Sequence, residues 1–159
     1  MTTVVRRLTP SAWEAWRLVR LRALAEDSAA FGSTYDREAA WSDEEWRTRT
    51  AALAPFVVEE DGRLVASAGL VTDAEGVPHL VAMWVDPETR RRGIGTSLLD
   101  AIVGVCRAAG HRVLRLGVTQ NNHAARSLYC QHGFVETGRT TPLARDPRVI
   151  EHEMELKLR

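Results

Sequence analysis

Three arginines and two glycines stand together in RRRGIG, residues 90–95, between an apolar segment and an amphipathic one. The first turn of a helix has backbone N–H groups without a partner in the helix, and the helix dipole adds partial positive charge there. Glycine lacks a Cβ, so an anion can come close to the backbone, and the arginines add charge. This combination predicts a phosphate-binding site at the start of a helix.

Two familiar phosphate-binding patterns fit these residues poorly. A P-loop needs a lysine after its second glycine, and Lys157 is the only lysine of the chain. The dinucleotide pattern G-x-G-x-x-G begins at Gly93 but has Leu98 in place of its third glycine. A nicotinamide-dependent enzyme would also need an acidic residue at the end of the next strand, and residues 114–118 contain none. The pattern that does match is R/Q-x-x-G-x-G/A.

A second pattern follows in residues 122–134, where NHAARSLY precedes Gly133-Phe134. The ordered pair resembles the GNAT superfamily of acyl-CoA-dependent N-acetyltransferases, which carries R/Q-x-x-G-x-G/A and then N-x-x-A-x-x-L-Y…G-F. MWVDP, residues 83–87, is similar to the splayed strand of that family and the turn after it, and Phe31-Gly32 is common in its bacterial members. The resemblance covers essentially the whole chain.

The resemblance implies that acetyl-CoA is the cofactor and that CoA is a product. Its pantetheine arm would pair with the fourth strand, and its pyrophosphate would bind at the start of the next helix. We expect Arg90 to make a direct contact, and Arg91 or Arg92 to contribute mainly backbone N–H groups. A solvated surface turn remains an alternative for the arginines, and Asn122 also fits a helix N-cap. The expected cofactor-binding residues are Met83, Trp84, Val85, Arg90, Arg91, Arg92, Gly93, Ile94, Gly95, Thr96, Asn122, Ala125 and Tyr129.

Acetyl transfer to an amine needs a neutral amine, a donor for the developing oxyanion, and a proton for the departing thiolate. Tyr129 matches the family tyrosine that hydrogen-bonds the leaving sulfur, so we expect it to be the general acid; simple packing is the alternative. Many family members carry a basic glutamate on the fourth or fifth strand, but residues 79–85 and 113–118 contain no glutamate. His79 is the nearest titratable candidate. A structural role for His79, and deprotonation through ordered water or of a low-pKa amine, stay open.

The segment after the first helix is expected to border the acceptor site, through Phe31, Tyr35 and Trp41. Aromatic rings and nearby carboxylates suit a cationic amine, whereas core packing and helix-terminal charge are the alternative roles. The expected function is therefore acetyl transfer from the CoA thioester to a primary amine of a small molecule or a peptide N-terminus, by direct attack in a ternary complex. The alternative is a non-catalytic acyl-CoA-binding regulator with the same fold.

Hydrophobic periodicity predicts the elements that position these residues, in the order β-α-α-β-β-β-α-β-α-β-β. The predicted strands are residues 4–8, 56–60, 63–71, 79–85, 113–118, 134–137 and 150–158. Capping boxes at residues 11–14 and 42–45 predict two helix starts, with Trp41 and Trp46 as a hydrophobic staple. Another helix runs from Ile94 to near Gly110, and the last is capped by Asn121 or Asn122 and ends before Gly133. Asp61-Gly62 predicts a type I′ hairpin turn.

These elements predict the α/β class, as an α+β mixed sheet with helices on both faces. The resemblance adds a central, mostly antiparallel sheet of about seven strands, splayed between strands four and five, with four helices on its two faces. We expect a single N-acetyltransferase domain over residues 1–159. A homodimer is compatible with the family, although no interface is identifiable from the sequence.

The composition narrows the classes of partner. Basic and acidic residues balance at 21 each, so no overall field favours nucleic acid or a membrane surface. No apolar run is long enough to span a bilayer and no signal peptide is recognisable, so a cytoplasmic protein is expected. Cys106 and Cys130 lack metal-ligand spacing, so no metal site is expected, and Cys106 fits a small buried hydrophobic residue.

Overall fold

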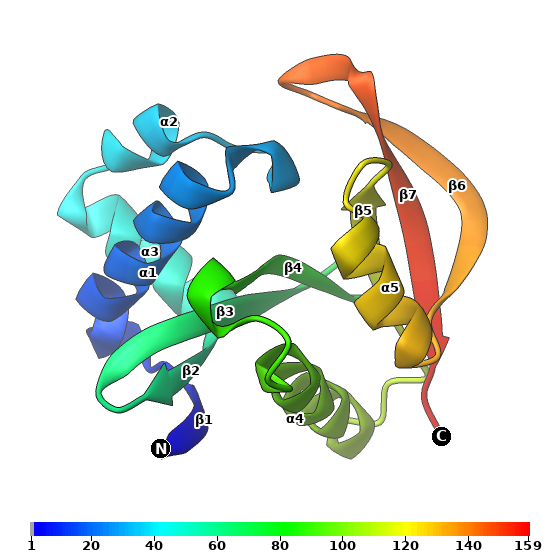
Figure 1. Cartoon of the computed structure of the whole chain (residues 1–159), viewed down its shortest axis with the longest axis horizontal. Helices are drawn as coiled ribbons and strands as arrows, with labels where there is room; N and C mark the ends of the chain where they lie inside the picture. The colour runs from blue at the N-terminus through cyan, green and yellow to red at the C-terminus, as the bar shows by residue number, and fades with distance from the viewer. Residues whose placement is uncertain (1) are drawn as a thin grey trace.

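The computed structural model describes residues 2–159, and its centre is a seven-stranded sheet in the order β1-β2-β3-β4-β5-β7-β6 (Figure 1). Only β4 and β5 are parallel; the other neighbours are antiparallel, which confirms the mixed, mostly antiparallel sheet. The strands are β1 (Thr3–Arg7), β2 (Phe56–Glu60), β3 (Arg63–Thr72), β4 (Pro78–Val85), β5 (Val113–Thr119), β6 (Val135–Leu143) and β7 (Asp146–Lys157).

The described residues form five α-helices, one more than the four predicted. They are α1 (Trp13–Glu26), α2 (Tyr35–Ala39), α3 (Asp43–Leu53), α4 (Ile94–Ala108) and α5 (His123–Gln131), with 3-10 turns at Pro10–Ala12, Ser28–Ala30 and Pro87–Thr89. The additional helix is α2, which is too short to show helical periodicity. It is held instead by the Thr34 side chain, which accepts from the backbone N–H of Arg37 at 3.2 Å, and by a buried ion pair of Glu38 with Arg20.

The capping boxes predicted at the starts of α3 and α1 had different outcomes. At α3, Ser42 Oγ accepts from the backbone N–H of Glu45 at 3.1 Å, and the rings of Trp41 and Trp46 pack 4.9 Å apart, as predicted. The Glu45 carboxylate pairs with Arg49 at 3.3 Å instead of returning the bond to Ser42, so half of the capping box is formed. The capping box expected at Ser11 was wrong. A 3-10 turn occupies its place, α1 begins only at Trp13, and no side chain caps it.

Helices cover both faces of the sheet, as expected. On one face α1 and α3 pack with β2 and β4 around Trp16, Val19, Trp46, Val57 and Trp84. On the other face α4 and α5 pack around Ile102, Leu116, Tyr129 and Met154. Along β5 the residues alternate, so Leu114, Leu116 and Val118 enter the α4 core, and Arg115, Gly117 and Thr119 lie on the opposite face.

The predicted splay between the fourth and fifth strands is present. β4 and β5 share only the pairs His79 with Arg115 and Leu80 with Leu116, both at the start of β4. Just beyond, Ala82 has a φ of 55°, and the register between β3 and β4 shifts between Ser67 and Gly69. A bulge of this kind bends a strand and increases its twist. The rest of β4 therefore turns away from β5.

The two cysteines are unpaired. Cys106 is buried in the α4 core, as predicted, and burial raises the pKa of its thiol, while Cys130 is exposed. Within residues 2–159, no three His, Cys, Asp or Glu side chains are grouped to hold a metal ion. None of the helices formed by these residues has the length and apolar character needed to cross a membrane.

The bulge at Ala82 leads to a prediction about stability. Replacing Ala82 with valine is expected to lower the free energy of unfolding by about 2 kcal/mol, because a β-branched residue with positive φ is strained. Ala82→Gly is the matched control and should change this free energy by less than about 1 kcal/mol, because glycine adopts positive φ freely. Urea unfolding measures both. Equal stability of the two variants would contradict a left-handed backbone at this position.

Candidate functional site

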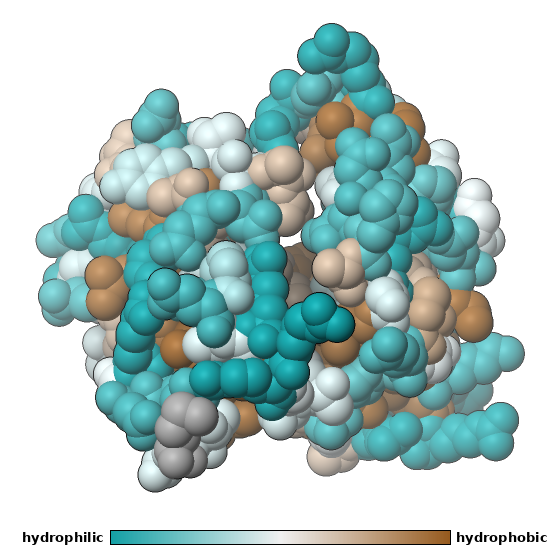
Figure 2. All heavy atoms as spheres, in the orientation of Figure 1, coloured by the Kyte–Doolittle hydropathy of each residue, from teal (hydrophilic) through white to brown (hydrophobic). Residues whose placement is uncertain are grey.

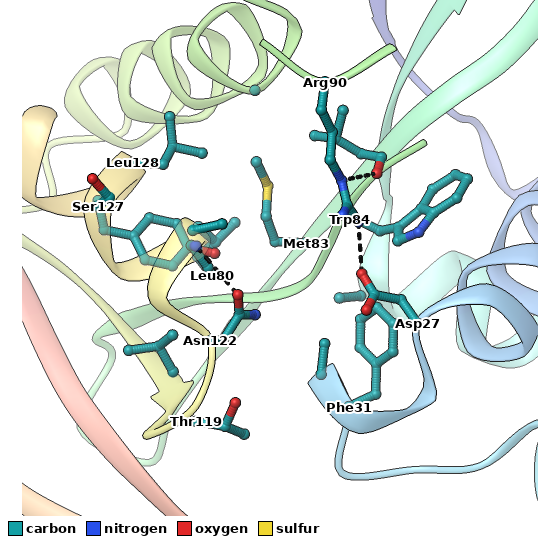
Figure 3. Close-up of a pocket in the computed structure, with 18 of the residues that line it drawn as sticks. Asp27, Phe31, Leu80, Met83, Trp84, Arg90, Thr119, Asn122, Ser127 and Leu128 are labelled. Atoms are coloured by element: carbon teal, nitrogen blue, oxygen red, sulfur yellow. Dashed lines mark hydrogen bonds and ion pairs between the residues drawn. The ribbon is translucent and has the colours of Figure 1, made fainter. Parts of the chain in front are cut away.

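A cleft of about 1200 Å³ opens where β4 and β5 diverge. In Figure 2 it is the hollow between the two sides of the molecule, with hydrophilic residues around its rim. Figure 3 shows its walls: Asp27, Phe31 and Trp84 lie on one side, and Thr119, Asn122, Ser127 and Leu128 lie on the other, with Met83 and Leu80 between them. The cleft thus joins the end of α1, the middle of the sheet and the start of α5.

The free edge of β4 forms the floor of the cleft. From Val81 to Val85 the strand pairs with β3 only, so the backbone groups that face β5 have no strand partner. An extended ligand can hydrogen-bond to such an edge as an added strand would. Trp84 contributes backbone here, because its side chain is buried in the α1 core. Met83 and Val85 also line the cleft.

The start of α4 borders the same cleft, and its glycines let a ligand come close to the backbone. Gly93 is the N-cap with a φ of 79°, and the first helical hydrogen bond runs from the backbone N–H of Ser97 to its carbonyl. The N–H groups of Ile94, Gly95 and Thr96 come before that bond and have no acceptor in the helix. A Cβ on Gly95 would lie 3.1 Å from Leu128 Cδ2, so a side chain would crowd the contact between α4 and α5.

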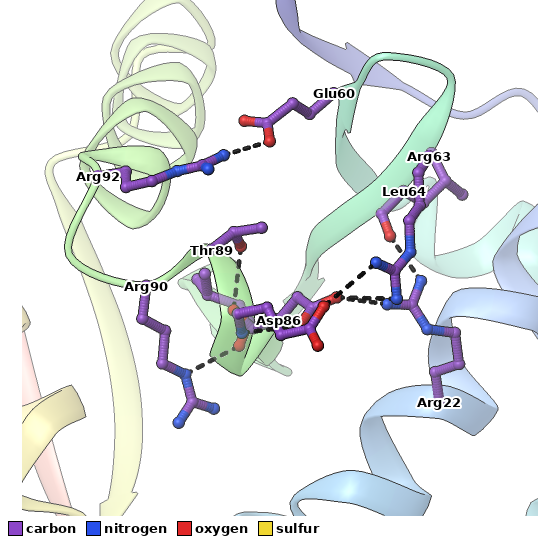
Figure 4. Close-up of polar contacts among 10 residues, drawn as sticks. Arg22, Glu60, Arg63, Leu64, Asp86, Thr89, Arg90 and Arg92 are labelled. Atoms are coloured by element: carbon purple, nitrogen blue, oxygen red, sulfur yellow. Dashed lines mark hydrogen bonds and ion pairs between the residues drawn. The ribbon is translucent and has the colours of Figure 1, made fainter. Parts of the chain in front are cut away.

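The three arginines before α4 have different partners. Arg90 donates through Nε to the carbonyl of Val85 at 3.0 Å and pairs with Asp27 at 2.7 Å (Figure 3). Arg92 pairs with Glu60, as Figure 4 shows, and does not line the cleft.

Arg91 lines the cleft, and its side chain makes no hydrogen bond or ion pair within residues 2–159. Its backbone has a φ of 66°. The guanidinium that is free to meet an anion is therefore that of Arg91, whereas the sequence had favoured Arg90 for direct contact.

A buried carboxylate anchors the loop between β4 and α4. Asp86 pairs with Arg22 at 2.6 Å and with Arg63 at 3.3 Å, and it accepts from the backbone N–H of Glu88 at 3.0 Å (Figure 4). Arg22 also donates to the carbonyl of Leu64 at 2.6 Å. Such charge-assisted bonds are strong, so the loop is held to α1 and β3. The sequence shows a turn at Asp86 but not its partner on α1, which lies 64 residues away.

Tyr129 and Asn122 both lie on the α5 side of the cleft. The Tyr129 side chain is buried at 5% exposure and packs edge-to-face on Phe134 with 5.7 Å between ring centroids. Burial raises the pKa of its phenol, which therefore stays protonated and able to donate at neutral pH. Asn122 Oδ1 accepts from the backbone N–H of Ala125 at 3.2 Å, which confirms the N-cap. Both residues line the cleft.

Besides Arg92, three of the expected site residues lie outside the cleft. His79 pairs with Asp73 at 2.9 Å on the far side of the β4–β5 contact. Tyr35 is 44% exposed on α2, and Trp41 packs against Trp46 and beneath the Arg49 guanidinium. The placements of His79 and Trp41 match the structural alternatives that the sequence had left open, whereas Tyr35 lies exposed on the surface and joins neither hydrophobic core of the described residues.

Of the expected acceptor residues, Phe31 does line the cleft, under the guanidinium of Arg20 at 4.8 Å from its ring centroid. Arg20, Asp27, Thr119 and Glu151 line it too, although no sequence pattern predicted them as site residues. Glu151 lies on β7, and only the sheet order brings β7 beside β5. Its place in the alternating segment 150–158 signals a one-sided strand but not which neighbour that side meets.

One arginine connects the two sides of the cleft. Arg145, at the turn of the β6–β7 hairpin, donates through Nε to the carbonyl of Phe31 at 2.7 Å and through a terminal nitrogen to that of Ser28 at 3.0 Å. Leu143, beside it, is buried. The hairpin therefore reaches across to the segment after α1 and bounds the cleft on that side.

The model of the Acetyltransferase (GNAT) family matches residues 18–134. The chain belongs to this family. The identification from RRRGIG and the asparagine–tyrosine pattern is thereby confirmed, and the cleft coincides with both motifs.

Relatives within the GNAT family are moderately similar in sequence. The L-amino acid N-acyltransferase MnaT of Escherichia coli is 31% identical over 64% of this chain, and the match covers 60% of MnaT, less than two thirds of its length. The peptidyl-lysine N-acetyltransferase YiaC of the same organism is 35% identical over 68% of this chain and 70% of its own. A GNAT acetyltransferase structure from Streptococcus pneumoniae superposes with a TM-score of 0.81 at 19% identity, over 99% of this chain and all of the other, which shows the shared fold.

The Arg145 bridge predicts a local effect on dynamics. Arg145→Met should remove both bonds to the segment after α1, and hydrogen exchange of the amides at the hairpin turn should accelerate about tenfold, since two bonds to a charged donor are lost. Arg148→Met is the control, because the hydrogen bonds of the Arg148 side chain within residues 2–159 go to Asp146, two residues away. Hydrogen exchange read by mass spectrometry compares them. Unchanged protection in Arg145→Met would show that the bridge does not hold the hairpin.

Proposed function

We propose that this protein is an acetyl-CoA-dependent N-acetyltransferase that acts on a primary amine of a small molecule or a peptide N-terminus, by direct attack in a ternary complex. The observation that carries the proposal is the free edge of β4 beside the open first turn of α4, in one cleft of a GNAT chain. The names of the two relatives include an amino-acid and a peptidyl-lysine acceptor, which supports an amine as the acceptor class.

The cleft offers matching groups to two parts of acetyl-CoA. The free N–H groups at the start of α4 and the unpaired Arg91 suit the pyrophosphate, because both favour anions. The backbone of β4 from Met83 to Val85 offers hydrogen-bonding groups to the amides of pantetheine. When bound, the cofactor would supply an activated acetyl group as a thioester.

The chain would contribute two electrostatic elements to the transfer. A backbone N–H on the free edge of β4 would polarise the thioester carbonyl as negative charge develops on its oxygen. Tyr129, kept protonated by burial, would donate its phenol proton or a hydrogen bond to the departing sulfur. His79 is left out of this scheme, because Asp73 holds it outside the cleft.

The different partners of Arg91 and Arg92 predict how two variants bind acetyl-CoA. Arg91→Ala should weaken acetyl-CoA binding about tenfold, because it removes a free guanidinium beside the phosphate site, and one charge-assisted hydrogen bond contributes about 1.5–3 kcal/mol. Arg92→Ala should have a smaller effect, because that side chain is engaged by Glu60. Isothermal calorimetry at two salt concentrations measures both. A larger loss in Arg92→Ala would overturn this assignment.

The activity itself is tested by release of free thiol from acetyl-CoA against a panel of amino acids, polyamines, aminoglycosides and peptides. At least one primary amine should raise thiol release above hydrolysis. With that acceptor, Tyr129→Phe should lower kcat about a hundredfold, as expected for removing a general acid, with unchanged affinity for acetyl-CoA. Tight binding of acetyl-CoA without acceptor-dependent release would instead support the non-catalytic acyl-CoA-binding regulator.

A further inference from the structure

We propose that the carboxylate of Glu151, on β7, is the general base that takes the proton from the acceptor amine. This inference rests on the proposed N-acetyltransferase function and adds the residue that the β4 and β5 strands do not supply. Glu151 lines the cleft together with Tyr129, Phe31 and the free edge of β4.

The position of Glu151 follows from the strand register. Glu151 pairs with Thr119 on β5, and its side chain leans along that strand over Gly117. A Cβ built on Gly117 would lie 2.1 Å from Glu151 Oε1, so the carboxylate occupies the space that a side chain at residue 117 would need. A missing side chain on β5 thus makes room for an acidic group from β7 on the cleft face of the sheet.

Among the described residues, Glu151 is the acidic residue of the cleft whose carboxylate has no ionic or hydrogen-bonding partner. Asp27, the other acidic residue that lines it, is paired with Arg90 at 2.7 Å. Glu151 makes no side-chain hydrogen bond or ion pair within the described residues, although Glu153 and Glu155 on the same face of β7 do. Its lone pairs are therefore free to accept from an ammonium group.

The surroundings of Glu151 favour proton uptake. Burial raises the pKa of its carboxyl, and no charged neighbour counters the shift. Its partners across the sheet, Thr119 on β5 and Thr141 on β6, are uncharged. The adjacent acidic residue on the same face of β7 is Glu153, which accepts from Thr137 and lies near Arg139. A base whose pKa is raised toward neutrality transfers protons more effectively at that pH.

The same burial means that the ionised Glu151 carboxylate lowers the stability of the folded protein. Because the folded protein holds this proton more tightly than the unfolded chain does, stability is greatest below the pKa of the unfolded state and falls as the pH rises through the folded pKa. An unpaired, desolvated carboxylate therefore destabilises the protein at neutral pH, and a purely structural role would not favour it.

The proposed step moves two protons and one acetyl group. Glu151 takes one proton from the ammonium group R–NH3+, and the nitrogen lone pair of R–NH2 attacks the thioester carbon. The C–S bond breaks, and its electron pair goes to sulfur, which takes a proton from Tyr129. The second proton lost by nitrogen restores Tyr129, and Glu151 releases its proton to solvent. The net change is R–NH3+ plus acetyl-CoA to the amide, CoA and one proton.

The test uses the acceptor that the wild-type protein acetylates. Glu151→Gln should lower kcat/KM for that amine about a hundredfold or more and flatten the acid limb of its pH profile, with unchanged affinity for acetyl-CoA. Its thermal midpoint at neutral pH should be equal to or above that of the wild type, a gain that the loss of a structural contact would not produce. Glu153→Gln is the matched control on the same face of β7 and should keep wild-type kinetics.

A relocation variant tests the position of the carboxylate independently. Gly117→Glu combined with Glu151→Ala places the acid on β5, where the removal of Glu151 clears the space. The double variant should recover at least tenfold over Glu151→Ala alone. Wild-type kinetics and an unchanged acid limb in Glu151→Gln would overturn the inference while the N-acetyltransferase function stands. A wild-type protein that acetylates no amine would refute the proposed function and this role of Glu151 with it.

Discussion

The early end of the pairing between β4 and β5 is the constraint on which the remaining features depend. Two residue pairs join the strands, and after Leu80 the backbone of β4 keeps only β3 as a partner. Unpaired backbone groups are costly when buried, so an open edge of this kind persists only where solvent or a ligand can satisfy it. The core of α4 and α5 beneath the sheet holds both strands in place despite the missing bonds.

The charged groups around this opening connect different elements of the fold. Asp86 and Arg22 fix the loop after β4, Arg90 joins that loop to the end of α1, and Arg92 joins it to β2. These contacts leave one arginine and the first turn of α4 without protein partners. The proposed anion site is thus flanked by two arginines that already have acidic partners, which limits the electrostatic repulsion among three adjacent arginines.

Much of the fold could be predicted from local patterns. Alternation and helical periodicity placed the strands and four of the helices, Gly110 and Gly133 marked helix ends, and the two ordered motifs identified the family and the splay. Side-chain partners were harder to predict. His79 pairs with Asp73, six residues earlier in the turn between β3 and β4, and neither hydrophobic pattern nor motif marks that pair. Glu151 enters the cleft because β7 lies next to β5, and that sheet order does not follow from local patterns.

The ion pair between Arg22 and Asp86 has a mechanical consequence. It fastens α1 to the end of β4, so the loop that leads into α4 is anchored from the opposite face of the sheet. Arg145 ties the segment after α1 to the β6–β7 hairpin. Helix α1 and the segment that follows it therefore carry contacts to both walls of the cleft.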